Sequence, residues 1–423
     1  FKLPNLFRRL FGEGAFSQAF MPNLVKVSQK GLFCAEILIK LSLIMLGLSL
    51  IVMLFAPLVT KALAFGFSPE TIALAVPLVR INFWYLLAIF IVTLLSALLQ
   101  YKNHFATTAF STALLNISMI TALLLALNLD QKSAAMYLSW GVVAGGMLQV
   151  LSHIIALKRL NLLRLLNLGI VKFAKGKRAK AKGFWQNFGH GIIGSSANQL
   201  SDFISTFIAS FLATGAISYL YYANRIFQLP LALFAIALST AIFPKIAKEI
   251  KSKNDTNAIN LLKKSFSLLF FLLIFSTIGG LVLANEIIWL LFQRGEFNTN
   301  NTIESAKVLQ MYMLGLLPFG LYKLFSLWLY AKMQQKIAAK IAIYSLFINT
   351  ALCLLLFKPL GASGLALAGS ISGLFLLGYA IFVFGIRQFL DIIFNRINLI
   401  TIILAVIFGY LLIELREVIY ANL

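Results

Sequence analysis

Acidic side chains are scarce in this sequence, which has 13 Asp and Glu residues against 36 Lys and Arg residues and a formal net charge of +23. Cysteine is rarer still, and Cys34 and Cys353 lie far apart inside apolar stretches. Without CxxC or HExxH spacing, neither a structural metal site nor a disulfide framework is expected. The sequence also has no GxxxxGK[ST] loop, so a nucleotide-driven pump has no support. Charged residues make up 12% of the chain, about half of their share in soluble globular proteins, which excludes that class.

Long apolar runs dominate what is present. Hydrophobic residues make up 61% of the 423 residues, and the mean hydropathy is +0.92. A helix of about 20 apolar residues spans the hydrocarbon core of a bilayer, so we expect an all-α polytopic membrane protein. The expected spans, of which the first is incomplete, are 1–20, 32–60, 72–101, 104–128, 133–157, 189–213, 216–244, 265–293, 305–331, 337–357, 361–386 and 398–415.

The cations are distributed unevenly among the loops. Alternate loops carry nearly all of them, including every charged residue of the acid-free segment from Lys158 to Lys182. This is the positive-inside pattern, which places those loops in the cytoplasm. The basic segment mixes leucines with its cations, which favours an interfacial helix against anionic lipid headgroups over a nucleic-acid site. We therefore expect membrane lipids as partners and no nucleic acid.

Two pairs of segments indicate an internal repeat. AFSQAFMPNLVK at 15–26 matches ALSTAIFPKIAK at 237–248, including the proline and the final lysine. TALLLALNLDQKSAAMYLS at 121–139 and TALCLLLFKPLGASGLALA at 350–368 form a second pair at nearly the same separation. Chance similarity between apolar segments is the alternative, but the shared proline and lysine favour duplication of a six-helix unit. Because helix 189–213 precedes the repeat in the second unit, we expect the natural protein to start one span before Phe1.

Polar residues follow one face of three apolar helices. Residues three or four apart share a helix face. The stripes are Lys2, Asn5, Arg9, Glu13 and Ser17 in the first helix, Ser195, Asn198, Asp202 and Ser205 in the second, and Ser218, Tyr221, Arg225 and Gln228 in the third. Arg8 and Asn224 flank two of them. Stripes from both repeats predict one water-filled cavity.

Cations dominate these stripes. An arginine at the centre of a span costs about 2.5–3.5 kcal/mol on insertion scales unless it faces water or a partner. A structural ion pair between Arg9 and Glu13 is the alternative reading, but Arg225 has no acid within one helical turn, and Lys323 adds another mid-span cation. We therefore favour a cationic cavity, in which paired guanidinium groups suit phosphate or pyrophosphate. Pro230 marks a place where one of these helices is expected to bend.

The opening stretch FKLPNLFRRLFGEGAFSQAFMP, with SYLYYANRIFQLP at 218–230 and ALSTAIFPKIAK, resembles the MurJ (MviN) family of bacterial lipid II flippases. That family is part of the multidrug, oligosaccharidyl-lipid and polysaccharide exporter superfamily. The resemblance implies two pseudo-symmetric six-helix bundles around a central cavity, with the first family helix missing here and only one clear extra helix at the C-terminus. The implied domains are an N-terminal lobe at 1–157 with five of its six helices, a basic interfacial linker at 158–188, a C-terminal lobe at 189–386, and an extra helix within 387–423.

The resemblance also implies residue roles. The implied substrate-binding residues are Arg8, Arg9, Arg225, Lys2, Glu13, Lys323, Ser218 and Asn224. Asn224 stands where the family usually has an aspartate, so an ion pair with Arg225 is absent. A sodium site known in the family would draw on Asp202 and helix 337–357, where Cys353 replaces an expected polar ligand. A Na⁺ coupling ion therefore stays unassigned, and we expect no catalytic residue, protein-bound metal or other cofactor.

The expected function is transport without bond breakage. The resemblance implies that the cavity captures the pyrophosphate of lipid II and that the lobes then rock to expose the headgroup on the outer face of the bacterial cytoplasmic (inner) membrane. The membrane potential or an ion gradient would drive the cycle. A flippase for another polyprenyl-pyrophosphate-linked oligosaccharide is the main alternative. A cation-coupled drug antiporter fits less well, because a cavity for cationic drugs should be acidic. We expect a monomer.

Overall fold

The computed structural model describes residues 27–179, 182–332 and 334–421, together with Phe16, Ala19, Phe20, Asn23 and Leu24. At positions 182, 187, 190–199, 202, 240, 244, 247, 251, 335 and 419–421 it describes the backbone alone. Across this part of the chain, every regular element is a helix, as the apolar runs predict. The chain divides into two compact units, Phe1–Gln199 and Leu200–Leu423, with the boundary inside one helix.

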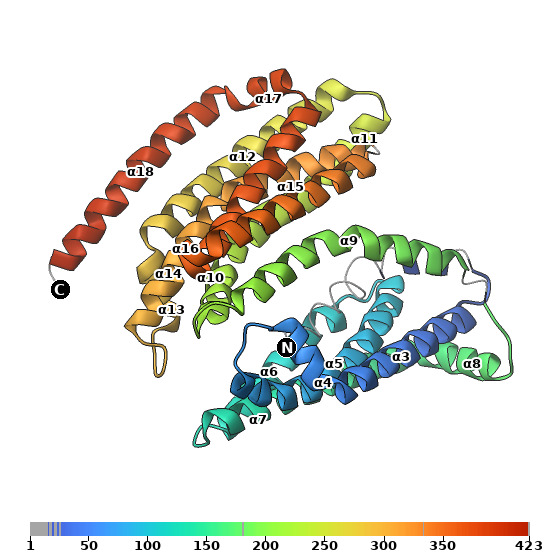
Figure 1. The fold of residues 1–423 in the computed structure, drawn as a ribbon. Helices are drawn as coiled ribbons and strands as arrows, with labels where there is room; N and C mark the ends of the chain where they lie inside the picture. Colours follow the sequence, from blue (N-terminus) through green and yellow to red (C-terminus); the bar gives the residue numbers. More distant parts are fainter. Residues whose placement is uncertain are drawn as a thin grey trace. The chain divides into compact units, whose positions relative to one another are not determined.

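The first unit contains the helices shown from blue to green in Figure 1. They are α3 (Lys30–Leu54), α4 (Ala56–Leu63), α5 (Pro69–Tyr101), α6 (Ala106–Leu125), α7 (Gln131–Arg159), α8 (Leu162–Ala174) and the first part of α9 (Lys182–Ala209). Helix α5 packs against α3 and α7, and α6 packs against α7. Two apolar clusters form the interior, one around Phe33 and Phe184 and the other around Tyr85 and Leu86.

The second unit continues from the end of α9 to the C-terminal helix. Its elements are α10 (Ala216–Pro230), η2 (Leu231–Ile236), α11 (Ala237–Lys251), α12 (Asp255–Val282), α13 (Ala284–Phe292), α14 (Thr299–Leu314), α15 (Leu316–Ala331), α16 (Gln335–Phe384), α17 (Ile386–Ile393) and α18 (Arg396–Ala421). One large apolar cluster, with Phe266 and Phe325 fully buried, runs through this unit. Helix α18 lies along α12 (Figure 1).

The 50-residue helix α16 is two membrane spans folded against each other. A straight helix would separate Ser345 and Ser372 by about 40 Å at about 1.5 Å per residue. Instead the Ser345 Oγ donates to the Ser372 carbonyl over 3.4 Å. The chain reverses at Gly361, whose φ of 58° lies in the left-handed region that glycine adopts without strain, just after Pro359. The separate spans predicted at 337–357 and 361–386 are therefore confirmed.

Three predicted spans are interrupted. The stretch 305–331 is interrupted at Gly315, between α14 and α15. The stretch 32–60 is interrupted at Phe55, because Pro57, in the first turn of α4, lacks the N–H that would continue α3. The stretch 265–293 is interrupted at Leu283, and its helix α12 begins ten residues earlier than expected, at Asp255, where Asn254 caps it.

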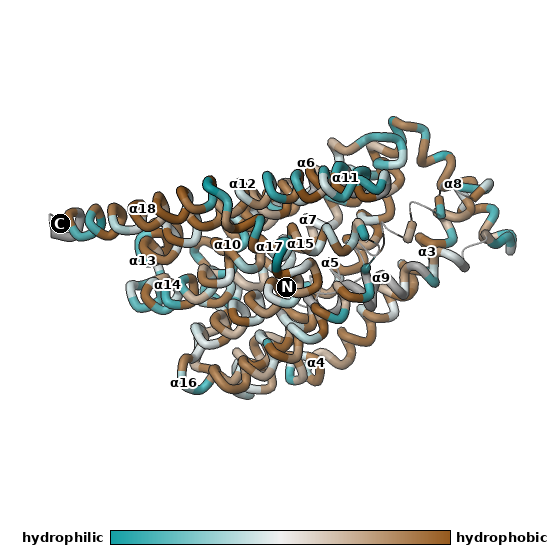
Figure 2. The backbone as a smooth tube through the Cα atoms, turned by 90° about the horizontal axis from the view of Figure 1, so that it is seen from above, coloured by the Kyte–Doolittle hydropathy of each residue, from teal (hydrophilic) through white to brown (hydrophobic). Residues whose placement is uncertain are grey.

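The outer faces of the helices suit lipid rather than water. Nine described helices are long and apolar enough to cross a membrane, and the folded α16 counts as one of them. Only 17% of the apolar window of α18 is buried inside the protein. Figure 2 shows the corresponding apolar surface along most of α18 and more polar residues towards its C-terminal end. Such exposed apolar surface is stable only when acyl chains cover it.

Candidate functional site

Half of the predicted substrate-binding residues lie outside the described part of the chain. Lys2, Arg8, Arg9 and Glu13 belong to this group. The side chain of Asp202, on which the implied sodium site would draw, also lies outside the described part of the chain. The convergence of arginines from both repeats on one cavity therefore stays a prediction. The other four predicted residues, Ser218, Asn224, Arg225 and Lys323, all belong to the second unit.

Helix α10 places Ser218, Tyr221 and Arg225 on one exposed face, as their spacing predicts. The guanidinium of Arg225 lies over the Tyr221 ring, 4.9 Å from its centroid, and its Nη2 donates a hydrogen bond of 3.0 Å to the Tyr221 hydroxyl. No acidic partner of Arg225 is present among the described residues. The stacking fixes the position of the charge while leaving the other N–H donors of the guanidinium available.

In the described structure, the half-buried Asn224 forms no hydrogen bond with Arg225. Its Oδ1 accepts a short hydrogen bond from Gln228 Nε2, one turn further along α10. This pairing satisfies the amide locally and leaves Arg225 as the only charged group of the helix. Asn224 therefore supports the polar face of α10 without neutralising its cation.

Pro230 changes the helix as the sequence suggests. It ends α10, and the next six residues, Leu231–Ile236, form the π-helical turn η2 before α-helix resumes at Ala237. Proline supplies no N–H to the carbonyl one turn earlier, so the regular hydrogen-bond ladder cannot continue there. A π-turn inside a long helix is a usual position for a bend. The π-turn begins six residues, or nearly two helical turns, beyond Arg225.

Lys323 is exposed on α15, which packs against η2 through other residues. Its neighbours Leu321 and Leu324 are buried in the core, so Lys323 lies on the opposite face of the helix. No ion pair of Lys323 is present among the described residues. The structure thus leaves two cations, Arg225 and Lys323, on exposed faces of apolar helices without a described carboxylate to neutralise them.

A buried polar cluster joins α9 to both halves of α16. The Asn349 Nδ2 donates to the Ser201 Oγ over 2.8 Å and lies 3.5 Å from the Ser205 Oγ, while the Ser372 Oγ donates to the Asn349 Oδ1 over 3.4 Å. The buried Cys353 thiol lies 3.7 Å from the Ser205 Oγ. These hydroxyls and the amide satisfy one another. The described residues hold no group of three or more His, Cys, Asp or Glu side chains suited to a metal ion.

Helix α8 forms the basic surface predicted for the segment after Lys158. Asn161 adopts the left-handed conformation (φ 57°), which turns the chain from α7 into α8. Leu166 packs into the core, and Gly169 brings α8 against the backbone of Gly31 at the start of α3. This contact anchors the helix to the protein.

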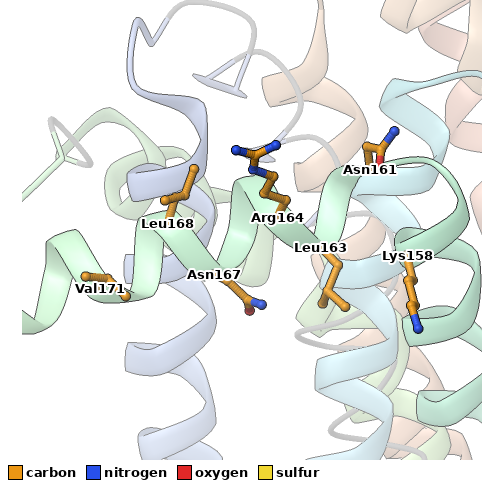
Figure 3. A pocket seen from close by; sticks show the side chains of 7 residues that line it. All are labelled: Lys158, Asn161, Leu163, Arg164, Asn167, Leu168 and Val171. Carbon is orange, nitrogen blue, oxygen red and sulfur yellow. The ribbon is translucent and has the colours of Figure 1, made fainter.

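A groove of about 380 Å³ lies along α8. Its lining residues are Lys158, Asn161, Leu163, Arg164, Asn167, Leu168 and Val171. Figure 3 shows Lys158, Leu163 and Asn167 extending to one side of α8, and Asn161 and Arg164 to the other. The groove thus combines cations with leucine side chains, as an amphipathic helix at a membrane surface does.

Two features escaped the sequence analysis because their partners are distant in sequence. Glu36, a buried acid in α3, accepts a 2.6 Å hydrogen bond from the backbone N–H of Ala179 and pairs with Lys40. The loop that follows α8 is thereby tied to α3. The second feature is the hydrogen-bonded cluster around Asn349. An asparagine inside the apolar span 337–357 indicated that its amide needs a polar partner, but not which residue supplies it.

Comparisons with known protein sequences identify the family of this chain. The family model described as lipid II flippase MurJ matches residues 1–422. A probable lipid II flippase MurJ of Helicobacter pylori is 48% identical over 93% of this chain and 88% of its own length. The corresponding protein of Haemophilus influenzae is 33% identical over 88% of this chain and 75% of its own length.

Solved structures give the same result. A lipid II flippase MurJ in an inward closed conformation matches with a TM-score of 0.79 and 25% identity, covering 99% of this chain and 90% of that structure. An inward-facing MATE multidrug transporter of the MOP superfamily shares the fold alone, with a TM-score of 0.68, 13% identity and coverage of 92% of this chain and 94% of its own. The chain therefore belongs to the MurJ family of lipid II flippases.

Proposed function

We propose that this protein moves lipid II from the inner to the outer face of the bacterial cytoplasmic membrane by alternating access, and that it breaks no bond. Membership of the MurJ family and the multi-pass helical fold support this function. The single observation that carries the proposed chemistry is Arg225, a cation on an apolar helix that stacks on Tyr221 and has no acidic partner among the described residues.

Arg225 is proposed to bind the pyrophosphate of the substrate. A guanidinium offers planar, paired N–H donors that match phosphate oxygens. Because Tyr221 already holds the side chain, little further side-chain entropy is lost when the anion binds. Ser218 and Lys323 would add a hydroxyl and a second positive charge from the same unit. Arg8, Arg9, Lys2 and Glu13 are proposed to complete the site from the first repeat.

The π-turn η2 is proposed to be the place where the helix bends during transport. It follows directly after the helix that carries Arg225 and packs against α15, which carries Lys323. A bend there would shift α10 relative to α11 without breaking the packing of α10 on α14. Two-state rearrangements of this kind commonly use such local irregularities as hinges.

The coupling ion stays unassigned. Sodium prefers several oxygen ligands with a carboxylate among them, whereas the described cluster around Asn349 offers serine hydroxyls and an amide that already pair with one another, together with the Cys353 thiol. These described groups do not fit a sodium site by themselves. The proposed transport cycle therefore assigns no role to an ion.

The basic groove on α8 is proposed to hold anionic lipid headgroups at the cytoplasmic surface. Lys158 and Arg164 supply positive charge, and Leu163 and Leu168 supply apolar contact for the upper part of an acyl chain. A monomer is proposed as the functional unit, because all of these features come from one chain. A flippase for another pyrophosphate-linked oligosaccharide would use the same charge, and the family match favours lipid II.

Lipid binding by the purified full chain tests the pyrophosphate site. We expect Arg225→Ala to weaken lipid II binding roughly tenfold to hundredfold, as the loss of a charged hydrogen bond does. Arg225→Lys should bind lipid II more tightly than Arg225→Ala does, because lysine keeps the positive charge. It should bind less tightly than the unaltered chain, because lysine lacks the paired N–H donors of a guanidinium. Arg294→Ala is the matched control, since Arg294 is an exposed arginine in the loop after α13. The site assignment is wrong if Arg225→Ala binds lipid II as tightly as the control does.

A further inference from the structure

We propose that a groove between α12 and α18 is a binding site for an anionic glycerophospholipid of the cytoplasmic leaflet. The groove has a volume of about 590 Å³. It is lined by Asn260, Lys263, Lys264, Ser267, Leu268, Phe271, Asn395, Ile397 and Thr401. The inference is independent of lipid II transport.

The polarity of the groove changes along α12. Asn260, Lys263 and Lys264 lie at its cytoplasmic end, and Leu268 and Phe271 follow one to two turns deeper in the span. From Lys263 to Phe271 the helix rises about 12 Å, which is close to half the thickness of the hydrocarbon core, about 15 Å. A phospholipid has the same order of groups, with charge at the interface and an acyl chain below it.

The two lysines are free to bind an anion. Lys263 is half-buried and Lys264 is exposed, and neither forms an ion pair in the described part of the chain. The acid nearest in sequence on α12 is Asp255, and it is paired with Lys332 over 2.7 Å. Lysines near the surface of an anionic leaflet attract its negatively charged headgroups, so a phosphate between two lysines matches the charge of this groove.

Ser267 supplies an independent indication of a ligand. It lines the groove, it is only 6% exposed, and its hydroxyl has no hydrogen-bond partner in the described structure. A buried hydroxyl without a partner is costly, so a missing acceptor is expected nearby. Ser267 lies about one turn below the lysines, which is where the ester oxygens of a glycerophospholipid would lie if its phosphate contacted Lys263 and Lys264.

The opposite wall of the groove is already fixed without a lipid. The Asn398 Nδ2 donates to the carbonyls of Ile392 and Ile393, which holds the start of α18 against the end of α17. The Thr401 hydroxyl donates to the Ile397 carbonyl over 2.8 Å. Because these donors are already bonded within the protein, a lipid would enter a preformed groove with little reorganisation.

Native mass spectrometry of the full chain in detergent, titrated with phosphatidylglycerol, tests the site. We expect Lys263→Gln/Lys264→Gln to weaken phosphatidylglycerol binding roughly tenfold or more. Lys336→Gln/Lys340→Gln is the matched control, because these exposed lysines lie on the same unit outside the groove. The control should bind within about twofold of the unaltered chain, since it removes equal charge elsewhere.

Three further measurements test the ligand class and the contribution of Ser267. Phosphatidylcholine should bind at least about tenfold more weakly than phosphatidylglycerol, because its headgroup has no net charge. Glycerol 3-phosphate should not displace phosphatidylglycerol, since it cannot contact Leu268 and Phe271. Ser267→Ala should weaken binding by a few fold, while the unfolding temperature without lipid should not fall, because the hydroxyl has no described partner to lose. Equal affinity of the lysine variant and the control, or equal binding of the two lipids, would overturn the proposal.

Discussion

The Nδ2 of Asn349 in α16 donates a 2.8 Å hydrogen bond to the Oγ of Ser201 in α9, and Asn349 is buried while Ser201 is half-buried within the second unit. Asn349 also accepts from Ser372 on the returning half of α16. One amide thus joins three helical segments in a setting where an unpaired polar group is costly.

Removing this amide should destabilise the second unit. We expect Asn349→Ala to lower the free energy of unfolding by about 1–3 kcal/mol, because it removes the buried amide whose hydrogen bonds join three helical segments. A double-mutant cycle with Ser201→Ala, measured by unfolding in mixed detergent, should give a coupling of about 0.5–1.5 kcal/mol. Ser363→Ala is the control, since its hydroxyl is exposed and bonds only the Leu360 carbonyl. A coupling near zero would show that the hydrogen bond contributes nothing.

Gly169 is required for the close approach of α8 and α3. A Cβ at this position would lie 2.0 Å from the Gly31 carbonyl oxygen, which is backbone and cannot move aside alone. Gly169→Ala should therefore separate the two helices and lower the unfolding temperature by several degrees, in the range of an overpacking substitution of about 1–3 kcal/mol. Gly47→Ala is the matched control, because a Cβ there meets open space within α3. An unchanged unfolding temperature for Gly169→Ala would contradict this packing.

Glu36 should protect the loop after α8 from proteolysis. Its carboxylate accepts the Ala179 N–H over 2.6 Å, so Glu36→Ala should release residues 175–179 and speed tryptic cleavage at Lys175, Lys177 or Arg178 several-fold. Glu36→Gln keeps an acceptor and should show a smaller effect. Glu304→Ala, which removes the partner of the exposed Lys307, serves as control. Cleavage rates that do not differ between Glu36→Ala and this control would refute the anchoring role.

Asp130 should make the stability of α7 depend on pH. The Ser133 hydroxyl and amide, followed by the Lys132 amide, hold the pKa of the Asp130 carboxyl below its usual value while it caps the helix. The folded-state pKa is lowered, so this contribution is present above the usual carboxyl pKa and is lost as the pH falls through the lowered folded value. The difference in unfolding temperature between the unaltered chain and Asp130→Asn should therefore shrink on acidification. A difference that is the same at pH 7 and below pH 3 would contradict the capping role.

The spans within the described residues and the polar stripe on α10 were predictable because they depend on local patterns. Run length identified the helices, and spacings of three and four residues correctly placed Ser218, Tyr221 and Arg225 on one face. Pro359 and Gly361 marked the reversal within α16 in the same way. Each of these signals comes from neighbours in the sequence.

The tertiary polar contacts were not predictable. Glu36 meets Ala179 across 143 positions, and Asn349 meets Ser201 across 148 positions. No periodicity of either segment encodes such a pairing, since it depends on how whole helices pack. The stacking of Arg225 on Tyr221 could have been predicted from the sequence, because a tyrosine one turn before an arginine on a helix face is a local pattern.

The most direct measurement is labelling of lipid II on the outer face of cells that have been depleted of their own lipid II flippase and supplied with the full-length form of this protein. The account predicts that labelling and growth are restored by the unaltered protein and by Arg294→Ala. It also predicts that both are lost with Arg225→Ala at equal membrane abundance. Full labelling with Arg225→Ala would contradict the central claim that this unpaired cation binds the pyrophosphate.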